Sequence, residues 1–243
     1  RQMCIRDRYA ENVYYGKPSG LMDQMASSVG GLVFIDFNDP KMPVVEKVDY
    51  DFAHSGYTLC TIDSGADHAD LTDEYAAMPI EMKKVAAFFG KEVLREVDEQ
   101  EFYAKIADVR KQTGDRAVLR AIHYFEENAR TLAQRDALQA GQFAAFAALV
   151  LESGRASFAL CQNVYCSTDV RHQGLSVALA LSQSILQGST GAWRMQGGGF
   201  AGTIQAYVPQ SLLERYHSEI ERVFGKGSCY ILRLREQGAV KVI

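Results

Sequence analysis

The 243-residue sequence predicts an α+β fold, and three observations point to this class. Residues 57–63 (YTLCTID) and 203–208 (TIQAYV) are rich in β-branched and aromatic side chains, which is the composition of β-strands. Alanine-rich and amphipathic stretches with helical spacing lie between them. The C-terminal part of the chain then follows the order strand, helix, strand, which is typical of a ferredoxin-like sandwich.

The first part of the chain predicts two helical segments separated by a turn. Residues 9–15 (YAENVYY) have the pattern of a helix end, and glycine and proline interrupt the chain at 16–20. The stretch LMDQMASSV at 21–29 is expected to form a short helix after a Ser19 cap. Residues 1–8 (RQMCIRDR) differ in composition from the rest of the chain, so we expect them to be foreign to the protein.

Three strands and an amphipathic helix are expected next. LVFIDF at 32–37 is a strand closed by an Asn-Asp-Pro turn, and 45–51 is its candidate neighbour. The strand at 57–63 leads into a polar loop. Apolar residues then recur at helical spacing from Tyr75 to Phe89, which predicts a helix with one face in the core.

Several helices are predicted in the middle of the chain, followed by a hairpin and a final α/β segment. Alanine-rich stretches at 121–135 and 141–153 favour close helix packing, and 176–186 is a further apolar helix. After the strand at 203–208, the expected elements are a helix at 210–224 and strands at 229–235 and 239–243.

Composition argues against several classes of function. A net charge of −4 gives no broad affinity for nucleic acid or for acidic membranes. No apolar run is long enough to span a bilayer, and no secretory signal is recognised, so we expect a cytoplasmic protein with no membrane partner and no nucleic-acid partner. The five scattered cysteines indicate buried, reduced thiols and neither a disulfide framework nor a zinc site.

Gly197, Gly199 and Gly202 match the G-x-G-x-x-G pattern of dinucleotide-binding proteins. That function requires a helix that begins at the glycines and holds the pyrophosphate at its N-terminus. Here the strand at 203–208 and Pro209 follow the glycines, so we predict a hairpin and reject an NAD site. The glycines would allow positive φ, close backbone approach and anion binding, while a hairpin that only packs on a neighbouring element is the alternative.

Two motifs together resemble segments of the galactokinases, which are members of the GHMP small-molecule kinases. They are GKPSGLMDQMASSVGGLVFIDF at 16–37 and MQGGGFAGT at 195–203. Between them, the segments TIDSGADHADLTDEY, RAIHYFEENAR and ESGRASFALCQNVY are also similar to family segments, in the same order. Either motif alone is a weak signal, but their order and spacing are specific, and the similarity extends from residue 9 onward.

This resemblance implies a two-domain GHMP kinase fold. Residues 1–55 are expected to be the remnant of a truncated N-terminal domain of the ribosomal protein S5 domain 2-like type, and 56–243 a ferredoxin-like C-terminal domain. Galactokinases also carry a sugar-recognition motif with an arginine, and a Gly-Leu-Ser-Ser-Ser loop around the ATP phosphates. Neither motif occurs in this sequence. We therefore expect the chain to be the C-terminal part of a galactokinase.

The activity that the resemblance implies is transfer of a phosphoryl group from ATP to galactose, giving galactose 1-phosphate. The Mg²⁺ that accompanies ATP is expected to have its main ligands in the missing N-terminal part. By resemblance, Asp23 is the catalytic aspartate and contacts the sugar hydroxyl that receives the phosphate. Its own context places it near a helix start, where the helix dipole favours the ionised form. Proton abstraction and orientation of the hydroxyl remain two alternatives for its role.

Tyr75 is the second candidate for sugar binding. It begins the helix after the polar loop, where the family has a tyrosine that contacts the sugar, and a half-buried core tyrosine is the alternative. His68 is expected to have a supporting role only. Asp63 and Asp67 are expected to hydrogen-bond to the backbone of the loop.

Gly197, Gly198 and Gly199 are expected, by the resemblance, near the nucleotide end of the site. There they would bring the backbone close to the transferred phosphate and support the Ser-rich loop. Three alternatives to an active galactokinase remain open: another GHMP sugar kinase acting on galactosamine or a uronic acid, a non-catalytic sensor of sugar and ATP, and an inactive fragment.

Overall fold

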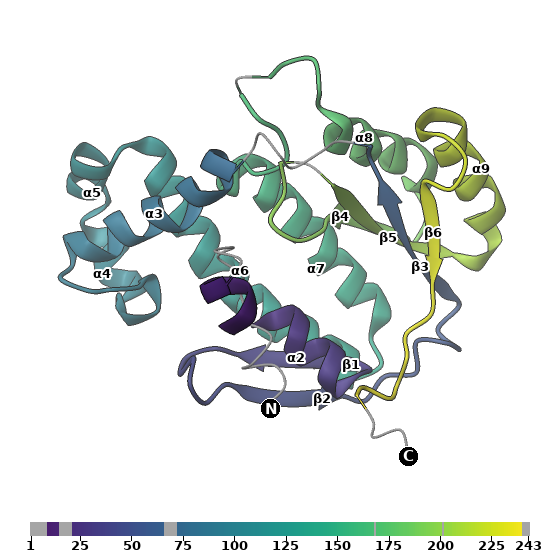
Figure 1. The fold of residues 1–243 in the computed structure, drawn as a ribbon, viewed down its shortest axis with the longest axis horizontal. Helices are drawn as coiled ribbons and strands as arrows, with labels where there is room; N and C mark the ends of the chain where they lie inside the picture. Colours follow the sequence, from purple (N-terminus) through teal and green to yellow (C-terminus); the bar gives the residue numbers. More distant parts are fainter. Residues whose placement is uncertain (1–8, 15–20, 66–71, 168, 201, 240–243) are drawn as a thin grey trace.

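The computed structural model describes residues 9–14, 21–65, 72–167, 169–200 and 202–239, and Figure 1 shows its fold. The strands are β1 (Leu32–Asp36), β2 (Val44–Val48), β3 (Tyr57–Asp63), β4 (Ala192–Met195), β5 (Thr203–Pro209) and β6 (Cys229–Leu232). The α-helices are α2 (Met22–Val29), α3 (Thr72–Phe88), α4 (Glu99–Ala104), α5 (Ile106–Thr113), α6 (Asp115–Gln139), α7 (Phe143–Ala156), α8 (Gly174–Leu186) and α9 (Leu213–Phe224). Short helical turns are η1 (Ala10–Tyr14), η2 (Leu94–Glu96), η3 (Ser157–Cys161) and η4 (Gln210–Leu212).

A four-stranded antiparallel sheet forms the ferredoxin-like part of the fold. Its spatial order is β4-β5-β3-β6. Along the chain its elements follow as β3, α8, β4, β5, α9 and β6, which is the βαββαβ order of ferredoxin-like folds. The α+β class, the strands at 57–63 and 203–208 and the ferredoxin-like order are therefore confirmed.

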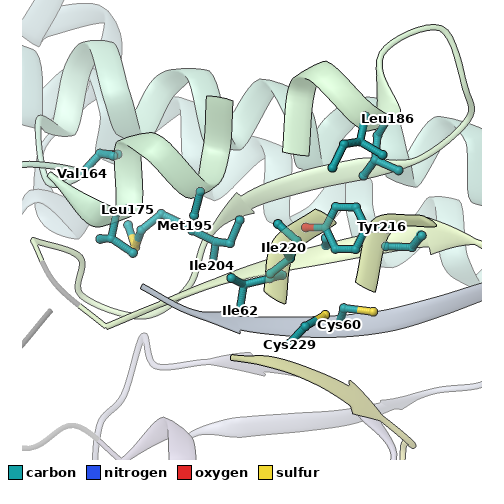
Figure 2. Packing of buried hydrophobic residues seen from close by; sticks show 14 residues of the cluster. Cys60, Ile62, Val164, Leu175, Leu186, Met195, Ile204, Tyr216, Ile220 and Cys229 are labelled. Carbon is teal, nitrogen blue, oxygen red and sulfur yellow. The ribbon is translucent and has the colours of Figure 1, made fainter. Parts of the chain in front are cut away.

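One face of this sheet forms a core with α8 and α9. Every second residue of β3 and β5 is buried, as expected for a face in contact with helices. The Tyr216 hydroxyl shares a hydrogen bond of 2.7 Å with the Ser182 hydroxyl, so neither buried oxygen lacks a partner. Figure 2 shows the apolar side chains of this core, which include Cys60, Ile62, Leu175, Leu186, Met195, Ile204, Ile220 and Cys229.

Cysteines in the described residues are buried and free. They are Cys60, Cys161, Cys166 and Cys229, as the scattered spacing predicted, while Cys4 lies outside the described residues. Burial raises the pKa of the Cys161 thiol to about 11, because the thiolate would lose its hydration. All four of these described thiols belong to the buried core.

Helices α3 to α7 are inserted between β3 and α8 (Figure 1). Helices α3 to α6 build a second core. The predicted helix from Tyr75 to Phe89 is α3, whose Val85 and Ala86 are fully buried in this core. The stretch at 121–135 is only part of α6, which is 25 residues long. The early part of α6 packs against α3 and α5, and α7 lies along it.

The N-terminal segment forms α2 and an antiparallel hairpin of β1 and β2. The register runs from Leu32 opposite Val48 to Asp36 opposite Val44, so β2 lies slightly earlier than the predicted 45–51. Helix α2 begins after Leu21, which makes no side-chain cap bond, and the predicted Ser19 cap lies outside the described residues. Val48 is buried among α6 and α7 side chains, so the hairpin shares a core with the rest of the chain.

The chain returns to this N-terminal segment after β6, which ends at Leu232 and is shorter than predicted. The Gly31 amide donates to the Arg235 carbonyl over 2.8 Å, and the Ala239 amide donates to the Ser28 carbonyl over 3.0 Å. Figure 1 shows this tail running from β6 toward α2 and β1. Residues 240–243 of the predicted last strand lie outside the described residues. The division at residues 55 and 56 remains a prediction.

One helical stretch corrects the expectation that no apolar run is long enough to span a bilayer. Phe143–Cys161 is 19 residues long and apolar enough to cross a membrane by length and composition. Its Phe143, Phe146 and Val150 side chains instead belong to a buried cluster with β2 and β4 residues. A core helix satisfies the same criteria as a membrane span, and these contacts are those of a core helix.

Candidate functional site

The glycine segment joins β4 to β5 as a hairpin. Met195 pairs with Ile204, and the Gln196 amide donates to the Thr203 carbonyl over 3.1 Å. A strand therefore follows the glycines, as predicted, and the geometry of a dinucleotide-binding helix is absent from this described segment. We call residues 196–202 the glycine hairpin.

Gly199 is required at its position for two reasons. Its φ is +84°, which L side chains rarely adopt. A Cβ built on it would also lie 1.9 Å from the Asn163 carbonyl oxygen. The hairpin therefore approaches residue 163 more closely than any side chain would allow.

Tyr75 packs directly on Gly198. A Cβ built on Gly198 would lie 2.0 Å from Cε2 of the tyrosine ring, so the ring occupies the space of the missing side chain. Tyr75 lies in the first turns of α3 and is 46% exposed, which leaves part of the ring accessible. The structure thus brings together Tyr75, predicted to contact the sugar, and one of the glycines predicted to lie near the phosphate.

Asn163 fixes the hairpin from the other side and was not found by sequence reasoning. Its side-chain amide donates to the Gly198 carbonyl over 3.1 Å, and its own carbonyl accepts from the Phe200 amide over 2.6 Å. Asn163 is 6% exposed, and its Oδ1 has no partner among the described atoms. An asparagine after a helix has no distinctive local pattern, so only the fold reveals this role.

Asp23 lies on the first turn of α2, and its carboxylate is exposed. It lines a cavity of about 400 Å³ bounded by α2, β1, α6, α7, β4 and β5. Arg194 and Gln205, which flank the glycine hairpin on β4 and β5, line the same cavity. Among the described residues, the lining includes neither Tyr75 nor Gly197, Gly198 and Gly199. The cavity lining therefore separates Asp23 from Tyr75 and the three glycines, so the predicted site residues form two groups.

Arg194 is held in place by a partly buried polar network. Its Nη1 lies 3.4 Å from Oε1 of Glu127, and its Nε donates to the Met195 carbonyl over 3.2 Å. Glu127 also accepts a hydrogen bond from Ser153 and pairs with Arg130. This network presents a cation to the cavity that contains Asp23.

Two pKa values in this network are displaced. Burial alone would raise the pKa of Glu127, but the Ser153 hydrogen bond and the charges of Arg194 and Arg130 outweigh it, so the net pKa lies below its ordinary value. Burial lowers the pKa of His123, and the Glu127 carboxylate opposes this only in part. At neutral pH the network therefore contains a charged Glu127 and a neutral His123.

The polar loop after β3 is only partly described. Asp63 accepts a hydrogen bond from the Gly65 amide over 2.9 Å, as predicted for a loop aspartate. Asp67 and His68 lie outside the described residues. Among the residues that the structure does describe, no three acidic, histidine or cysteine side chains are gathered to hold a metal ion.

A search against protein-family models found no match. Curated relatives do match: galactokinase of Glaesserella parasuis is 30% identical over 231 residues, which cover 93% of this chain and 56% of the relative. Galactokinase of Streptomyces coelicolor is 29% identical over 228 residues, covering 92% and 54%. The chain spans about half the length of the curated relatives it matches.

Comparison with solved structures identifies the fold. A crystal structure of Lactococcus lactis galactokinase complexed with galactose has a TM-score of 0.73 at 22% identity, covering 97% of this chain and 59% of the other. A crystal structure of L. major mevalonate kinase in complex with R-mevalonate has a TM-score of 0.54 at 14% identity, covering 94% and 56%. The chain has the GHMP kinase fold. The predicted similarity of this chain to part of a galactokinase is likewise confirmed.

Proposed function

We propose that this chain is part of an ATP-dependent galactokinase and provides its catalytic aspartate and its glycine hairpin. The observation that carries the proposal is the contact of Tyr75 with Gly198. Sequence reasoning assigned these two residues separately to the sugar and to the phosphate side of one reaction. Their direct packing is what a site of phosphoryl transfer to a sugar requires, because donor and acceptor must lie side by side.

In this proposal the galactose C1 hydroxyl attacks the γ-phosphorus of ATP. The new O–P bond forms as the bond from phosphorus to the ADP oxygen breaks, and the hydroxyl proton leaves toward Asp23 or solvent. Asp23 accepts a hydrogen bond from that hydroxyl, and Tyr75 contacts a sugar oxygen. Gly197, Gly198 and Gly199 offer backbone N–H groups near the phosphate. Assistance of this kind by a carboxylate is typically worth about 10²–10⁴-fold in rate.

Magnesium and ATP fit this chain only in part. Among the described residues that line the cavity next to α2, Asp23 is the single acidic one. Mg²⁺ in kinases is usually held by one or two carboxylates together with phosphate oxygens. We therefore propose that this chain contributes at most one ligand, and that residues outside it provide the others. Like the activity, a cytoplasmic location is part of the proposal.

Galactose binding to the 243-residue chain tests the sugar assignment. Trp193 is the only tryptophan and lies on β4 beside the glycine hairpin, so its fluorescence reports on this region. We expect galactose to change the signal in the parent chain and to bind more weakly to the Tyr75→Phe variant. Calorimetry provides the independent affinity. No detectable binding of any sugar to the folded full-length protein that contains this chain would contradict the assignment, because galactokinases carry a further sugar-recognition motif that these 243 residues lack.

A substrate panel separates the alternatives. Galactose, galactosamine and galacturonic acid are offered with MgATP to the full-length protein that contains this chain, and ADP and sugar phosphate are both quantified. Galactose is expected to have the highest kcat/KM. A preference for either other sugar would indicate a different sugar kinase, and binding of sugar and ATP without turnover would indicate a sensor. Transfer at a normal rate by the 243-residue chain alone would show that it needs no further segment.

A further inference from the structure

Arg120 is a fully buried arginine at the centre of the helical insertion. It lies on α6, its side chain is 0% exposed, and it is the largest fully buried side chain among the described residues. Burial of a guanidinium is costly unless its N–H groups are paired. The groups that it contacts therefore reveal what the arginine holds together.

Arg120 joins two segments that are far apart in the sequence. Its Nη1 donates to Oε2 of Glu81 on α3 over 2.9 Å. Its Nε donates to the carbonyl oxygen of Cys161, the last residue of η3, over 3.0 Å. A rigid, planar guanidinium that makes both bonds fixes the distance between the two segments.

The α3 side of this bridge leads to Tyr75. Pro79 lies inside α3 and has no N–H, so the carbonyl of Tyr75, four residues earlier, loses its helical hydrogen bond. Side chains hold this first part of the helix instead. Arg116 binds both oxygens of Glu81, the shorter bond being 2.6 Å, and also lies 3.4 Å from Glu74, the neighbour of Tyr75.

The other side of the bridge leads to the glycine hairpin. After Cys161, Gln162 has a left-handed backbone with φ of +53°, and the next residue is Asn163. Asn163 then makes its two hydrogen bonds to Gly198 and Phe200. The Arg120 guanidinium thus binds the backbone only two residues before Asn163, the residue that fixes the hairpin.

We propose that Arg120 is a positioning residue that holds Tyr75 against Gly198. The contacts form a closed circuit: Tyr75 packs on Gly198, Gly198 is bound by Asn163, and Cys161 and Glu81 are bound by the same guanidinium. Its consequence for sugar affinity rests on the proposed function, because it assumes that Tyr75 contacts the sugar. The positioning itself does not depend on any ligand.

The Arg120→Lys variant tests the bridge. Lysine retains the charge and can reach Glu81, but a single ammonium cannot reproduce the planar pair of bonds to Glu81 and Cys161. The readout is hydrogen exchange of the Phe200 amide, which donates to Asn163, in the 243-residue chain without ligand. We expect exchange to become roughly tenfold faster or more, the effect of losing one charge-assisted hydrogen bond.

Val109→Ala is the matched control. Val109 is fully buried in the same helical core and takes no part in the bonds of the circuit, so the Val109→Ala substitution is expected to lower global stability and leave the bridge in place. We expect Phe200 exchange to remain at the parent value after correction for global unfolding. If Arg120→Lys does not fold, Glu81→Gln removes one charge from the same bridge and is expected to accelerate the same amide.

The outcomes distinguish the two proposals. Unchanged Phe200 exchange in a folded Arg120→Lys or Glu81→Gln chain would overturn the positioning role. Faster exchange together with a roughly tenfold weaker galactose Kd is the expected result. Faster exchange in a protein that never binds galactose supports the positioning role and counts against the proposed function alone.

Discussion

At the residue scale, the candidate site depends on the absence of a side chain at its glycines. Gly198 has a backbone conformation open to any residue, yet the Tyr75 ring occupies the space of its Cβ. Gly197 is the reverse case, because its φ is +72° and nothing lies within 4 Å of a Cβ built there. The sequence predicts a glycine loop, but only the fold reveals which glycine is needed for contact and which for backbone conformation.

Gly198→Ala is therefore expected to push the Tyr75 ring away from the hairpin. The added methyl cannot coexist with ring atoms 2.0 Å away, so the ring must move. We expect a galactose Kd about tenfold or more weaker, the scale of one misplaced contact, measured by calorimetry. Gly197→Asn is the control, because asparagine tolerates a left-handed backbone and meets no neighbour. Equal affinities in both variants and the parent would contradict the proposed role of the ring.

His123 gives a prediction about pH. Burial lowers its pKa in the folded state below the ordinary value of 6.5, so the unfolded state binds more protons between these two values. The free energy of unfolding is then constant above the unfolded pKa and decreases as the pH falls through 6.5 toward the folded pKa. The slope from one such group is at most about 1.4 kcal/mol per pH unit.

Urea unfolding of the parent chain and of His123→Gln between about pH 5 and 8 checks this prediction. The variant is expected to lose part of the decrease below pH 6.5 that the parent shows. Glu127 has the same sign but acts at lower pH, because its folded pKa lies below 4.5. Identical slopes in the two proteins above pH 5 would show that His123 does not titrate differently in the two states.

Residue types with a local pattern could be predicted, and residues that act through distant contacts could not. Asp23 and Tyr75 were found from motifs and helix starts, although whether they contact a sugar remains a prediction. Asn163, Arg120 and Arg194 were missed. The bonds of Asn163 to Gly198 and of Arg120 to Cys161 join residues 35 and 41 positions apart, so no local pattern announces them.

At the element scale, the position of β4, which is an edge strand of the sheet, depends on its packing against α7. A Cβ built on Gly154 would lie 3.2 Å from both the Trp193 carbonyl oxygen and Cβ of Arg194, so α7 packs closely along β4 at this residue. The prediction of close packing for the alanine-rich segment at 141–153 agrees with this contact, although α7 itself spans Phe143–Ala156. Through β4, this contact also sets the position of Arg194.

Gly154→Val is expected to destabilise the protein by about 1–3 kcal/mol, because the larger side chain forces α7 away from β4. Ala148→Val is the matched control on an exposed face of the same helix, where only the small difference in helix propensity applies. Chemical denaturation of the two variants gives the comparison. A Gly154→Val variant as stable as the control would show that α7 and β4 can separate without cost.

Strands in the sheet interior were predicted closely, and elements at its edge were not. β3 and β5 alternate between buried and partly exposed residues along their length, so both sequence and structure identify them. β6 was expected to continue to residue 235 but ends at Leu232, because it pairs with β3 on one side only and then turns toward α2. The sequence CYILRLR, in which Arg233 and Arg235 alternate with Leu232 and Leu234, does not contain that information.

At the scale of the whole molecule, the tail after β6 packs against the end of α2 and the start of β1. Gly30 and Gly238 meet with no room for a side chain, since a Cβ on Gly238 would lie 2.1 Å from the Ser28 carbonyl oxygen. Sequence order predicted the ferredoxin-like sheet, because the C-terminal part of the chain follows the order strand, helix, strand. It did not predict that the tail after β6 would be tied to α2, the helix that carries Asp23.

Gly238→Ala is expected to loosen α2. The methyl displaces the tail from Ser28 and removes the hydrogen bond of Ala239, so the α2 amides should exchange faster while those of β3 and β5 do not change. Hydrogen exchange resolved by segment measures both regions in one experiment. Ala239→Gly keeps the backbone bond and is the control. Unchanged exchange in α2 would show that the tail does not support this helix.

Asp23→Asn provides the most direct test of the central claim, that this chain contributes the catalytic aspartate of a galactokinase. Galactose 1-phosphate formation from MgATP is measured for the full-length protein that contains this chain, with calorimetry for galactose binding. We predict that kcat decreases by about 10²–10⁴-fold while the variant stays folded and still binds galactose. A kcat close to that of the parent would contradict the account.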